Sequence, residues 1–386
     1  MKHSPNGGEP KFISTLSPSP GTPRKIHPSA AFRCTPAQSH DERPGLKVFA
    51  SLLLIALVCA ALAAYAVYAP IGPPADTSDQ QATYVDIAPG TGSQAIAAQL
   101  EQAGVLRSRY AFLLLRVVKG GKLIAGEYRF NHPAPATEVY ARMTRGDVYT
   151  IPLTIPEGYN IFDIAQAVEA AGLGSRNTFL AAERSQTSLI ADLAPNAPSL
   201  EGYLFPDTYR FARHVAPSQI LAAMVRRFRQ VAAQLNLTSN LPTTVILASL
   251  IEKEVSQDSE RPLVASVFQN RLAQNMPLAT DPSVIYAALL DGRYRGTIYA
   301  SDLQSGSPYN TYRHTGLTPG PICNPGIAAL KAALAPAQTD YLYFVADAQG
   351  HSRFSATLKQ HSEQVQTYRR AIGRPAPAPP PSKHRK

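Results

Sequence analysis

The longest stretch of hydrophobic positions runs from residue 48 to residue 71 and contains no charged side chain. A bilayer core is crossed by about 20 apolar helical residues, so this stretch predicts a transmembrane helix over residues 47–71. A cleaved signal peptide has a shorter apolar core near the start of the chain, whereas 47 residues precede this stretch. We therefore expect an uncleaved, single-pass anchor.

The charges that flank the apolar stretch predict its orientation. Arg33, Arg43 and Lys47 precede it, and Asp76 and Asp79 are the first charged residues after it. Because basic residues stay on the cytoplasmic side of a membrane, the N-terminus is predicted to be cytoplasmic. The remainder of the chain is then periplasmic, on the outer side of a cell inner membrane.

Polar segments of low complexity are predicted on both sides of the anchor and at the C-terminus. Residues 1–46 are rich in Pro, Ser, Gly and His, which predicts a disordered cytoplasmic tail. Residues 72–83 form a short polar linker, and residues 374–386 form a basic, Pro-rich disordered tail.

An internal similarity links residues 87–104 to residues 155–172. Each copy predicts a strand, a turn at glycine, an amphipathic helix and a glycine stop, so we interpret it as a packing unit. The order of strand, helix, helix and strand within residues 84–150 resembles LysM-like modules, which often bind polymers of N-acetylglucosamine. Sugar binding and a purely structural role both stay open for this module.

From residue 151 onward, apolar positions recur with the period of an α-helix. The predicted helices cover residues 161–171, 176–183, 217–235, 243–255, 261–274 and 282–289, and a strand covers residues 341–347. The class is therefore α+β, with one transmembrane helix, the small LysM-like module and a mainly helical α+β domain over residues 151–373.

Charge and cysteine usage exclude several classes of function. The net charge is +10, but residues 1–47 and 374–386 carry +4 each, which leaves only +2 for residues 48–373. The body therefore lacks the basic surface that nucleic-acid binding requires. Cys34, Cys59 and Cys323 have no spacing typical of a disulfide framework or a metal site, nor do the histidines, so we expect no metal and no cofactor.

Six long motifs follow residue 200 in a fixed order. They are LEGYLFPDTYRF (200–211), ASLIEKEV (248–255), VFQNRL (267–272), PLATDPSVIYA (277–287), SPYNTYRHTGLTPGPICNPG (307–326) and YLYFVAD (341–347). Over residues 84–370 the chain resembles the YceG-like (MltG) family of endolytic murein transglycosylases. Two positions depart from the family pattern: Ala279 replaces a polar residue, and Cys323 replaces a small one.

The resemblance implies that Glu254 is the catalytic acid. On a helix over residues 243–258, capped by Thr243 or Thr244, Glu254 projects about 60° from the apolar stripe and Glu252 about 100° to its other side. Burial beside the stripe would raise the pKa of Glu254, as a general acid near neutral pH requires. Glu252 is the fallback, and the competing interpretation is that both glutamates are solvated charges paired with Lys253 or Arg261.

A lytic transglycosylase requires one carboxylic acid, whereas most glycoside hydrolases use two. The acid protonates the oxygen between N-acetylmuramic acid and N-acetylglucosamine, and the muramic 6-hydroxyl then closes on C1 to give a 1,6-anhydro end. Asp281 is the candidate second carboxylate for a hydrolase, although a turn or helix cap is the favoured interpretation for Thr-Asp-Pro. A non-catalytic anchor that only binds peptidoglycan is the third hypothesis.

Hydrogen-bonding and aromatic side chains in the motif-rich loops are candidates for contact with a sugar chain. The candidate substrate-binding residues are Asn270, Thr280, Asp281, Tyr309, Asn310 and Tyr312. A surface turn with its tyrosines on the core is the alternative for the loop around Tyr309. The resemblance further implies cuts within nascent peptidoglycan strands, which would end their elongation, and proximity to penicillin-binding synthases.

Overall fold

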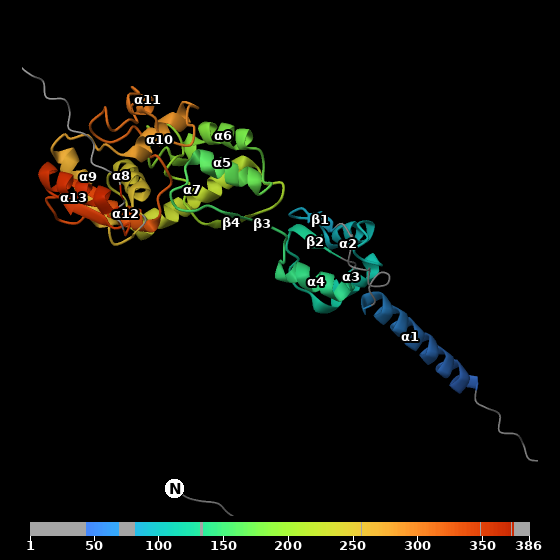
Figure 1. Cartoon of the computed structure of the whole chain (residues 1–386). Coiled ribbons are helices and arrows are strands. Elements are labelled where there is room, and N and C mark those ends of the chain that lie inside the picture. Colours follow the sequence, from blue (N-terminus) through green and yellow to red (C-terminus); the bar gives the residue numbers. More distant parts are fainter. Residues whose placement is uncertain are drawn as a thin grey trace, which may run out of the picture. The chain divides into compact units, whose positions relative to one another are not determined.

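The computed structural model describes residues 44–68, 82–131, 134–255, 257–347, 349–371 and 373. The chain divides into two units between Leu62 and Ala63, and each is described by itself. The predicted apolar helix is α1, Pro44–Tyr68, of which Lys47–Tyr65 is long and apolar enough to cross a membrane (Figure 1). Cys34, the C-terminal tail and most of the predicted N-terminal tail and linker lie outside the described residues.

A small α/β module follows the linker. Its elements are β1 (Thr83–Ile87), α2 (Ser93–Gln102), α3 (Arg109–Lys119), β2 (Gly126–Phe130) and α4 (Ala136–Arg145). The strands pair antiparallel, with Val85 opposite Tyr128, and their inner side chains join α2, α3 and α4 in one buried cluster. The predicted order of strand, helix, helix and strand is confirmed, while the resemblance to LysM-like modules stays a hypothesis.

Glycine ends α4 for a steric reason. Gly146 adopts a left-handed conformation with φ of +75°, and its backbone N–H donates to the carbonyl of Arg142. A Cβ at this position would lie only 2.6 Å from the side chain of Ile124. This turn therefore requires glycine both for its backbone angles and for the close approach of residue 124.

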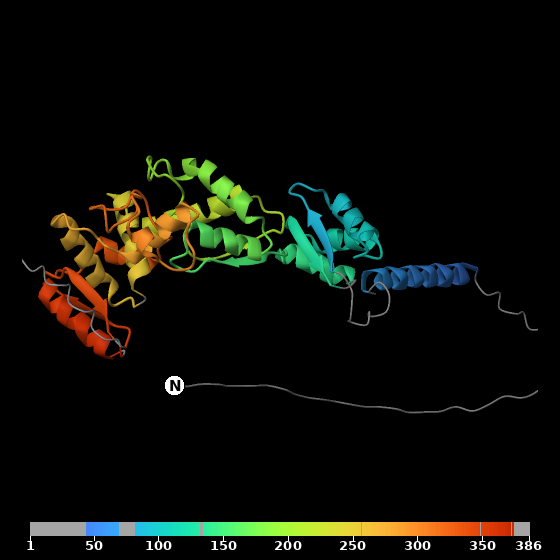
Figure 2. The ribbon, with the colours of Figure 1, turned by 45° about the horizontal axis from the view of Figure 1, so that its top comes forward.

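The larger mixed α+β part begins at residue 151 and has its own hydrophobic core (Figures 1 and 2). Its first elements are β3 (Ile151–Thr154), α5 (Ile161–Ala170), α6 (Arg176–Ser185), a 3-10 turn η1 (Thr187–Ile190), β4 (Thr208–Phe211) and α7 (Pro217–Gln234). The remaining elements are α8 (Leu241–Glu254), α9 (Arg261–Ala273), α10 (Asp281–Leu290), α11 (Ala300–Leu303), α12 (Ile327–Leu334), β5 (Tyr343–Ala346), β6 (Ser352–Ser355) and α13 (Leu358–Ala371). β3 pairs with β4 and β5 with β6, both antiparallel.

Helix α8 differs from the sequence prediction at both ends. It begins after Asn240, which is left-handed with φ of +53°, so the predicted caps Thr243 and Thr244 are wrong. It ends at Glu254, where the prediction ran on to residue 258, and Val255 is already extended. α8 packs against α9 and α12, and its last turn contacts the first residues of both helices through Glu252.

Candidate active site

Glu254 is the last residue of α8 and is half-buried. Burial, followed by the negative charge of Asp281, raises the pKa of its carboxyl to about 7, although Arg271 acts in the opposite direction. The position at a helix C-terminus also disfavours a negative charge. The pKa of Glu254 is therefore raised in the direction that the sequence predicted, to a value at which a substantial fraction of the carboxyl is protonated near neutral pH.

Asp281 and Tyr312 form a hydrogen-bonded pair near Glu254. The Tyr312 hydroxyl donates to Asp281 Oδ1 at 2.6 Å, and both side chains are exposed. Burial and the charges of Asp281 and Glu254 raise the pKa of the Tyr312 hydroxyl. Asp281 is the first residue of α10, and Thr280 occupies the N-cap position without a side-chain cap bond. The interpretation of Asp281 as the helix cap is therefore wrong.

Arg271 completes this charged group, and sequence reasoning did not select it. Its Nε donates to the carbonyl of Leu342 at 2.7 Å, and its Nη1 donates to that of Leu278 at 2.9 Å. These bonds fix the guanidinium where it interacts with Glu254 and Tyr312, and burial lowers its pKa. Its place in the VFQNRL motif, directly after Asn270, was the available signal.

Glu252 has a structural environment that corrects the sequence prediction. Its side chain is 6% exposed, and it pairs with Arg261 at 3.1 Å. Its second oxygen accepts the backbone N–H of Gly326 at 3.0 Å, at the start of α12. Glu252 is thus a buried ion-pair member, not the more solvated carboxylate that the helix projection indicated, because α9 and α12 cover that side of α8.

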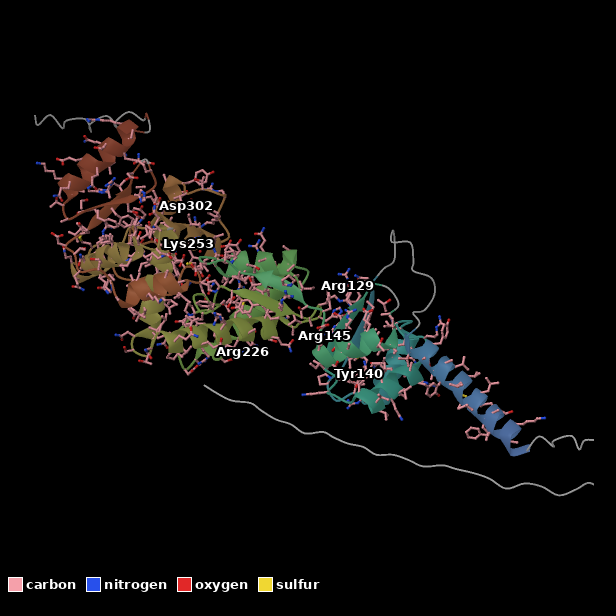
Figure 3. The ribbon with its side chains drawn as sticks, turned by 90° about the horizontal axis from the view of Figure 1, so that it is seen from below. Arg129, Tyr140, Arg145, Arg226, Lys253 and Asp302 are labelled. Carbon is pink, nitrogen blue, oxygen red and sulfur yellow. The ribbon has the colours of Figure 1, made fainter. Side chains whose placement is uncertain are left out.

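An open cleft of about 440 Å³ lies beside the end of α8. Its lining residues are Glu157, Gly158, Glu252, Lys253, Glu254, Val255 and Arg261. Lys253 (labelled in Figure 3) is exposed and donates to the carbonyl of Gly158 at 3.2 Å. Burial, followed by the charge of Glu252, raises the pKa of Glu157. The cleft therefore gives a substrate access to Glu254 from a side rich in carboxylates.

Asn270 and Thr280 are engaged with the protein backbone. The Asn270 amide donates to the carbonyls of Thr339 at 2.9 Å and Tyr341 at 3.0 Å, which holds the segment before β5. Thr280 is buried, and its backbone N–H donates to the hydroxyl of Thr311. The Thr280 hydroxyl is buried without a hydrogen-bond partner in the described part of the chain.

Tyr309 and Asn310 support the loop that carries Tyr312. The Tyr309 ring packs 5.2 Å from that of Tyr286 and is largely buried, which fits the core alternative for this residue. The Asn310 amide is fully buried; it donates to the carbonyl of Ser305 at 2.8 Å, and its oxygen accepts the N–H of Tyr312 at 3.1 Å. The structure thus brings Asp281 and Tyr312 to Glu254 and gives Asn270, Tyr309 and Asn310 framework partners.

A buried polar network anchors the segments around α8. Asn324 donates to Glu201 at 2.7 Å and to the carbonyl of Tyr159 at 3.0 Å, and it accepts the N–H of Leu204 at 2.8 Å. Complete burial raises the pKa of Glu201 to about 8, although the N–H of Ile161 donates to it. These bonds join two sequence-distant motifs to the backbone of Tyr159, the neighbour of the cleft residue Gly158.

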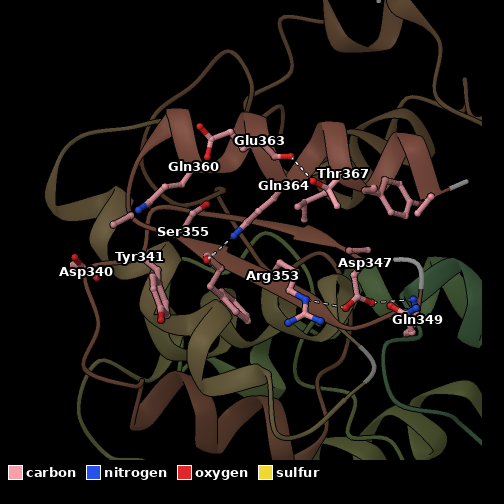
Figure 4. A pocket seen from close by; sticks show the side chains of 16 residues that line it. Asp340, Tyr341, Asp347, Gln349, Arg353, Ser355, Gln360, Glu363, Gln364 and Thr367 are labelled. Carbon is pink, nitrogen blue, oxygen red and sulfur yellow. Dashed lines mark hydrogen bonds and ion pairs between the residues drawn. The ribbon is translucent and has the colours of Figure 1, made fainter. Parts of the chain in front are cut away.

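A larger cavity of about 750 Å³ lies between the β5–β6 hairpin and α13 (Figure 4). Arg353 and Asp347 form an ion pair at its edge, and the Gln364 amide donates to the carbonyl of Phe354. None of the predicted site residues lines this cavity. Within the described residues, no group of three or more His, Cys, Asp or Glu is arranged to hold a metal ion.

Comparison of the sequence with known proteins identifies the family of this chain. Residues 85–367 match the sequence model of the YceG-like family. The chain is 34% identical to the endolytic murein transglycosylase of Bacillus subtilis (strain 168), with 76% of this chain and 87% of the relative covered. It is 30% identical to the endolytic murein transglycosylase of Streptococcus pneumoniae serotype 2, with 76% and 59% covered.

A solved structure of a YceG-like protein from Listeria monocytogenes is 31% identical, with a TM-score of 0.49, and covers 74% of this chain and 99% of that one. The region that matches the family model, residues 85–367, contains nearly all of the module and the segments that carry Glu254, Arg271, Asp281 and Tyr312. The chain belongs to the YceG-like family.

Proposed function

We propose that this protein is an endolytic peptidoglycan lytic transglycosylase. It cleaves the β-1,4 bond between N-acetylmuramic acid and N-acetylglucosamine in nascent strands and leaves 1,6-anhydromuramic ends, which ends their elongation. The observation that carries the proposal is Glu254, whose pKa of about 7 suits a general acid in an open cleft. The names of the two relatives support the same reaction class.

The reaction uses Glu254 twice. Its carboxyl first transfers a proton to the glycosidic oxygen as the bond to muramic C1 breaks, and the N-acetylglucosamine end leaves as an alcohol. The resulting carboxylate then takes the proton of the muramic 6-hydroxyl, whose oxygen bonds to C1. Glu254 ends protonated, as it began, and no water is consumed.

The neighbouring charges suit both halves of this cycle. Asp281 disfavours ionisation of Glu254 before the first transfer, and its negative charge also favours the positive charge that develops at C1. Arg271 opposes Asp281 and stabilises the carboxylate that exists between the two transfers. Tyr312 fixes the Asp281 carboxylate through the 2.6 Å hydrogen bond.

A hydrolase of the same glycan is the second candidate function. It is favoured by the exposure of Asp281 and by its interaction with Glu254, since a second carboxylate there could activate water or attack C1. A non-catalytic peptidoglycan anchor would require neither the Glu254 carboxyl nor the Asp281 carboxylate.

Mass spectrometry of digested glycan separates these functions. Transglycosylation gives ends that are lighter by one water than hydrolysed ends, and an anchor gives no product. Products obtained in ¹⁸O-labelled water provide the matched control, because only hydrolysis incorporates the label. Labelled ends without anhydro ends would refute the proposed reaction.

The proposed topology places residues 1–46 in the cytoplasm and the cleft in the periplasm, with α1 in the inner membrane. It is supported by the length and composition of α1 and by the flanking charges. We further propose that residues 84–150 assist capture of the strand, that residues 151–373 form the catalytic domain, and that penicillin-binding synthases supply the nascent strand. A reporter that is active only after export should be active when fused at residue 80.

A further inference from the structure

Helix α3 of the small module has two apolar faces, of which only one is buried. Ala111, Phe112 and Leu115 point into the core of the module. The adjoining face carries large hydrophobic side chains that the described part of the chain leaves exposed. They are Tyr110 (68% exposed), Leu114 (46%), Val117 (84%) and Val118 (72%).

These four residues form a continuous stripe. At about 100° per residue, they fall within an arc of roughly 100° on the helix surface. Single exposed hydrophobic residues are common on soluble proteins, but a stripe along three turns of one helix indicates an interaction surface. The exposed fraction of Val117 is the highest of the large hydrophobic residues exposed in the described structure, so burial of this face would remove considerable apolar area from water.

The charged residues of α3 are all basic, and one of them, Arg109, pairs with Glu101 of α2. Arg109, Arg116 and Lys119 belong to α3, and Lys122 follows it, whereas the helix contains no acidic residue. An apolar stripe on a helix whose charged side chains are Lys and Arg, with a tyrosine at one end, matches the surface of an anionic bilayer, where aromatic and basic side chains meet the headgroups. Another protein would require a complementary acidic surface.

The chain holds this helix close to a membrane if α1 is inserted. Residues 69–82 separate α1 from β1, and at full extension they span at most about 50 Å. A tether of this length gives the module a high effective concentration at the bilayer surface, so even a weak contact would be occupied.

We propose that the exposed face of α3 docks on the periplasmic surface of the membrane, with Val117 and Val118 at the level of the lipid headgroups. The proposal rests on the proposed membrane anchor. Docking of this kind orients the module toward the layer in which lipid-linked glycan strands are made.

Tryptophan fluorescence tests this docking sharply, because the chain contains no tryptophan. The full chain with Val117→Trp is reconstituted in vesicles of brominated phosphatidylcholine and phosphatidylglycerol, and quenching is compared with non-brominated vesicles. Two matched variants calibrate the signal: Leu54→Trp lies within α1, and Leu358→Trp is a 61% exposed leucine on α13. We expect quenching for residues 54 and 117 and none for residue 358.

Charge reversal supplies the second readout. Lys119→Glu with Lys122→Glu, added to Val117→Trp, should reduce quenching several-fold in vesicles with phosphatidylglycerol, and high salt should act likewise. Quenching at residue 54 but not at residue 117 would overturn the docking and leave the anchor intact. A lack of quenching at residue 54 would overturn the anchor itself. A blue shift at residue 117 that rises with protein density without quenching would identify a second copy as the partner, against the proposal.

Discussion

At the scale of single residues, the proposed chemistry depends on three charged side chains that interact with one another: Glu254, Asp281 and Arg271. Glu254 is supported by the hydrophobic side of α8, while Asp281 and Arg271 exert opposite effects on its pKa. A carboxyl group with a pKa of about 7 is nearly balanced between its acid and base forms at neutral pH. That balance suits a reaction in which the same group gives up a proton and recovers one.

Glu254→Gln should remove nearly all activity. Glutamine preserves the size of the side chain but cannot transfer a proton, so the rate of anhydro-end formation should fall by about 10⁴-fold or more. The folded protein should remain intact. Because the pKa of Glu254 is raised on folding, its ionisation lowers wild-type stability as the pH rises from about 4.5 towards about 7. The melting temperature should therefore fall less between pH 5 and pH 8 for the variant than for the wild-type protein, as thermal unfolding at the two pH values would show. Full activity in this variant would rule out Glu254 as the acid.

Asp281→Asn should move the pH dependence of the reaction. Removal of the negative charge lowers the pKa of Glu254, so the decline of kcat/KM at alkaline pH should shift to a lower pH. Asp291→Asn, a change at the other end of α10 where the carboxylate pairs with Arg293, is the matched control and should leave the profile unchanged. A loss as severe as that of Glu254→Gln at every pH would instead identify Asp281 as the second carboxylate of a hydrolase.

The sequence predicted the raised pKa of Glu254 because part of its cause is local: Glu254 lies three positions after the buried Ile251 on the same helix. It could not assign Asn270 or Asn310, since an amide in a polar motif has the same sequence signature whether it contacts sugar or backbone. The partners of Asn270 lie at residues 339 and 341, and only the folded chain brings them to α9. Arg271 was missed for the same reason.

At the scale of elements, α8 is positioned by buried polar contacts as much as by its apolar stripe. Glu252 connects α8 to Arg261 at the start of α9 and to the N–H of Gly326 at the start of α12. A negative charge at a helix N-terminus is favourable, so this carboxylate serves both helices. The last turn of α8 is thereby fixed two residues before Glu254.

Glu252→Gln should act on stability more than on chemistry. Breaking a buried ion pair costs about 3–5 kcal/mol, because Arg261 stays buried, although its bond to Asp258 reduces the loss. Denaturant unfolding should show this loss, while kcat per folded molecule stays within about tenfold of wild type, far above Glu254→Gln. The exposed neighbour Lys253→Gln is the control for unfolding and should change stability little. An unchanged stability for Glu252→Gln would contradict the structural role.

The elements that sequence patterns predicted well have their stabilising contacts nearby in the chain. α5 begins with a capping box, in which the side chains of Asn160 and Asp163 each accept a hydrogen bond from the backbone N–H of the other residue. The predicted bounds of this helix differ from those in the structure by one residue. α8 lacks such a cap, and its start depends on the left-handed Asn240, so the pattern misplaced it. Helices α12 and α13 were not predicted. α12 is short and rich in alanine, and α13 has no fully buried residue, so neither shows a clear apolar stripe.

At the scale of the whole molecule, the described residues after the linker contain two separate hydrophobic cores. One lies in the module between β1 and α4, and the other extends from Leu153 to Ala333. The core of the module comes mainly from its own elements and also includes Val67 of α1, whereas the buried members of the larger core all lie between residues 153 and 333. The function nevertheless couples the parts, since the proposed substrate is made at the membrane.

A chain that begins at Thr83 should therefore be soluble in mild detergent or buffer and folded. Circular dichroism should show the helical content of both cores, and kcat on saturating soluble glycan strands should match the full chain, because Glu254, Asp281 and Arg271 are all retained. The same truncated chain should lose activity on strands embedded in vesicles, since the anchor no longer concentrates it there. Full-length protein reconstituted in the same vesicles is the control. Equal activity of both proteins on vesicle-bound strands would show that the anchor contributes nothing to substrate capture, and an insoluble truncated chain would show that the boundary at residue 83 is misplaced.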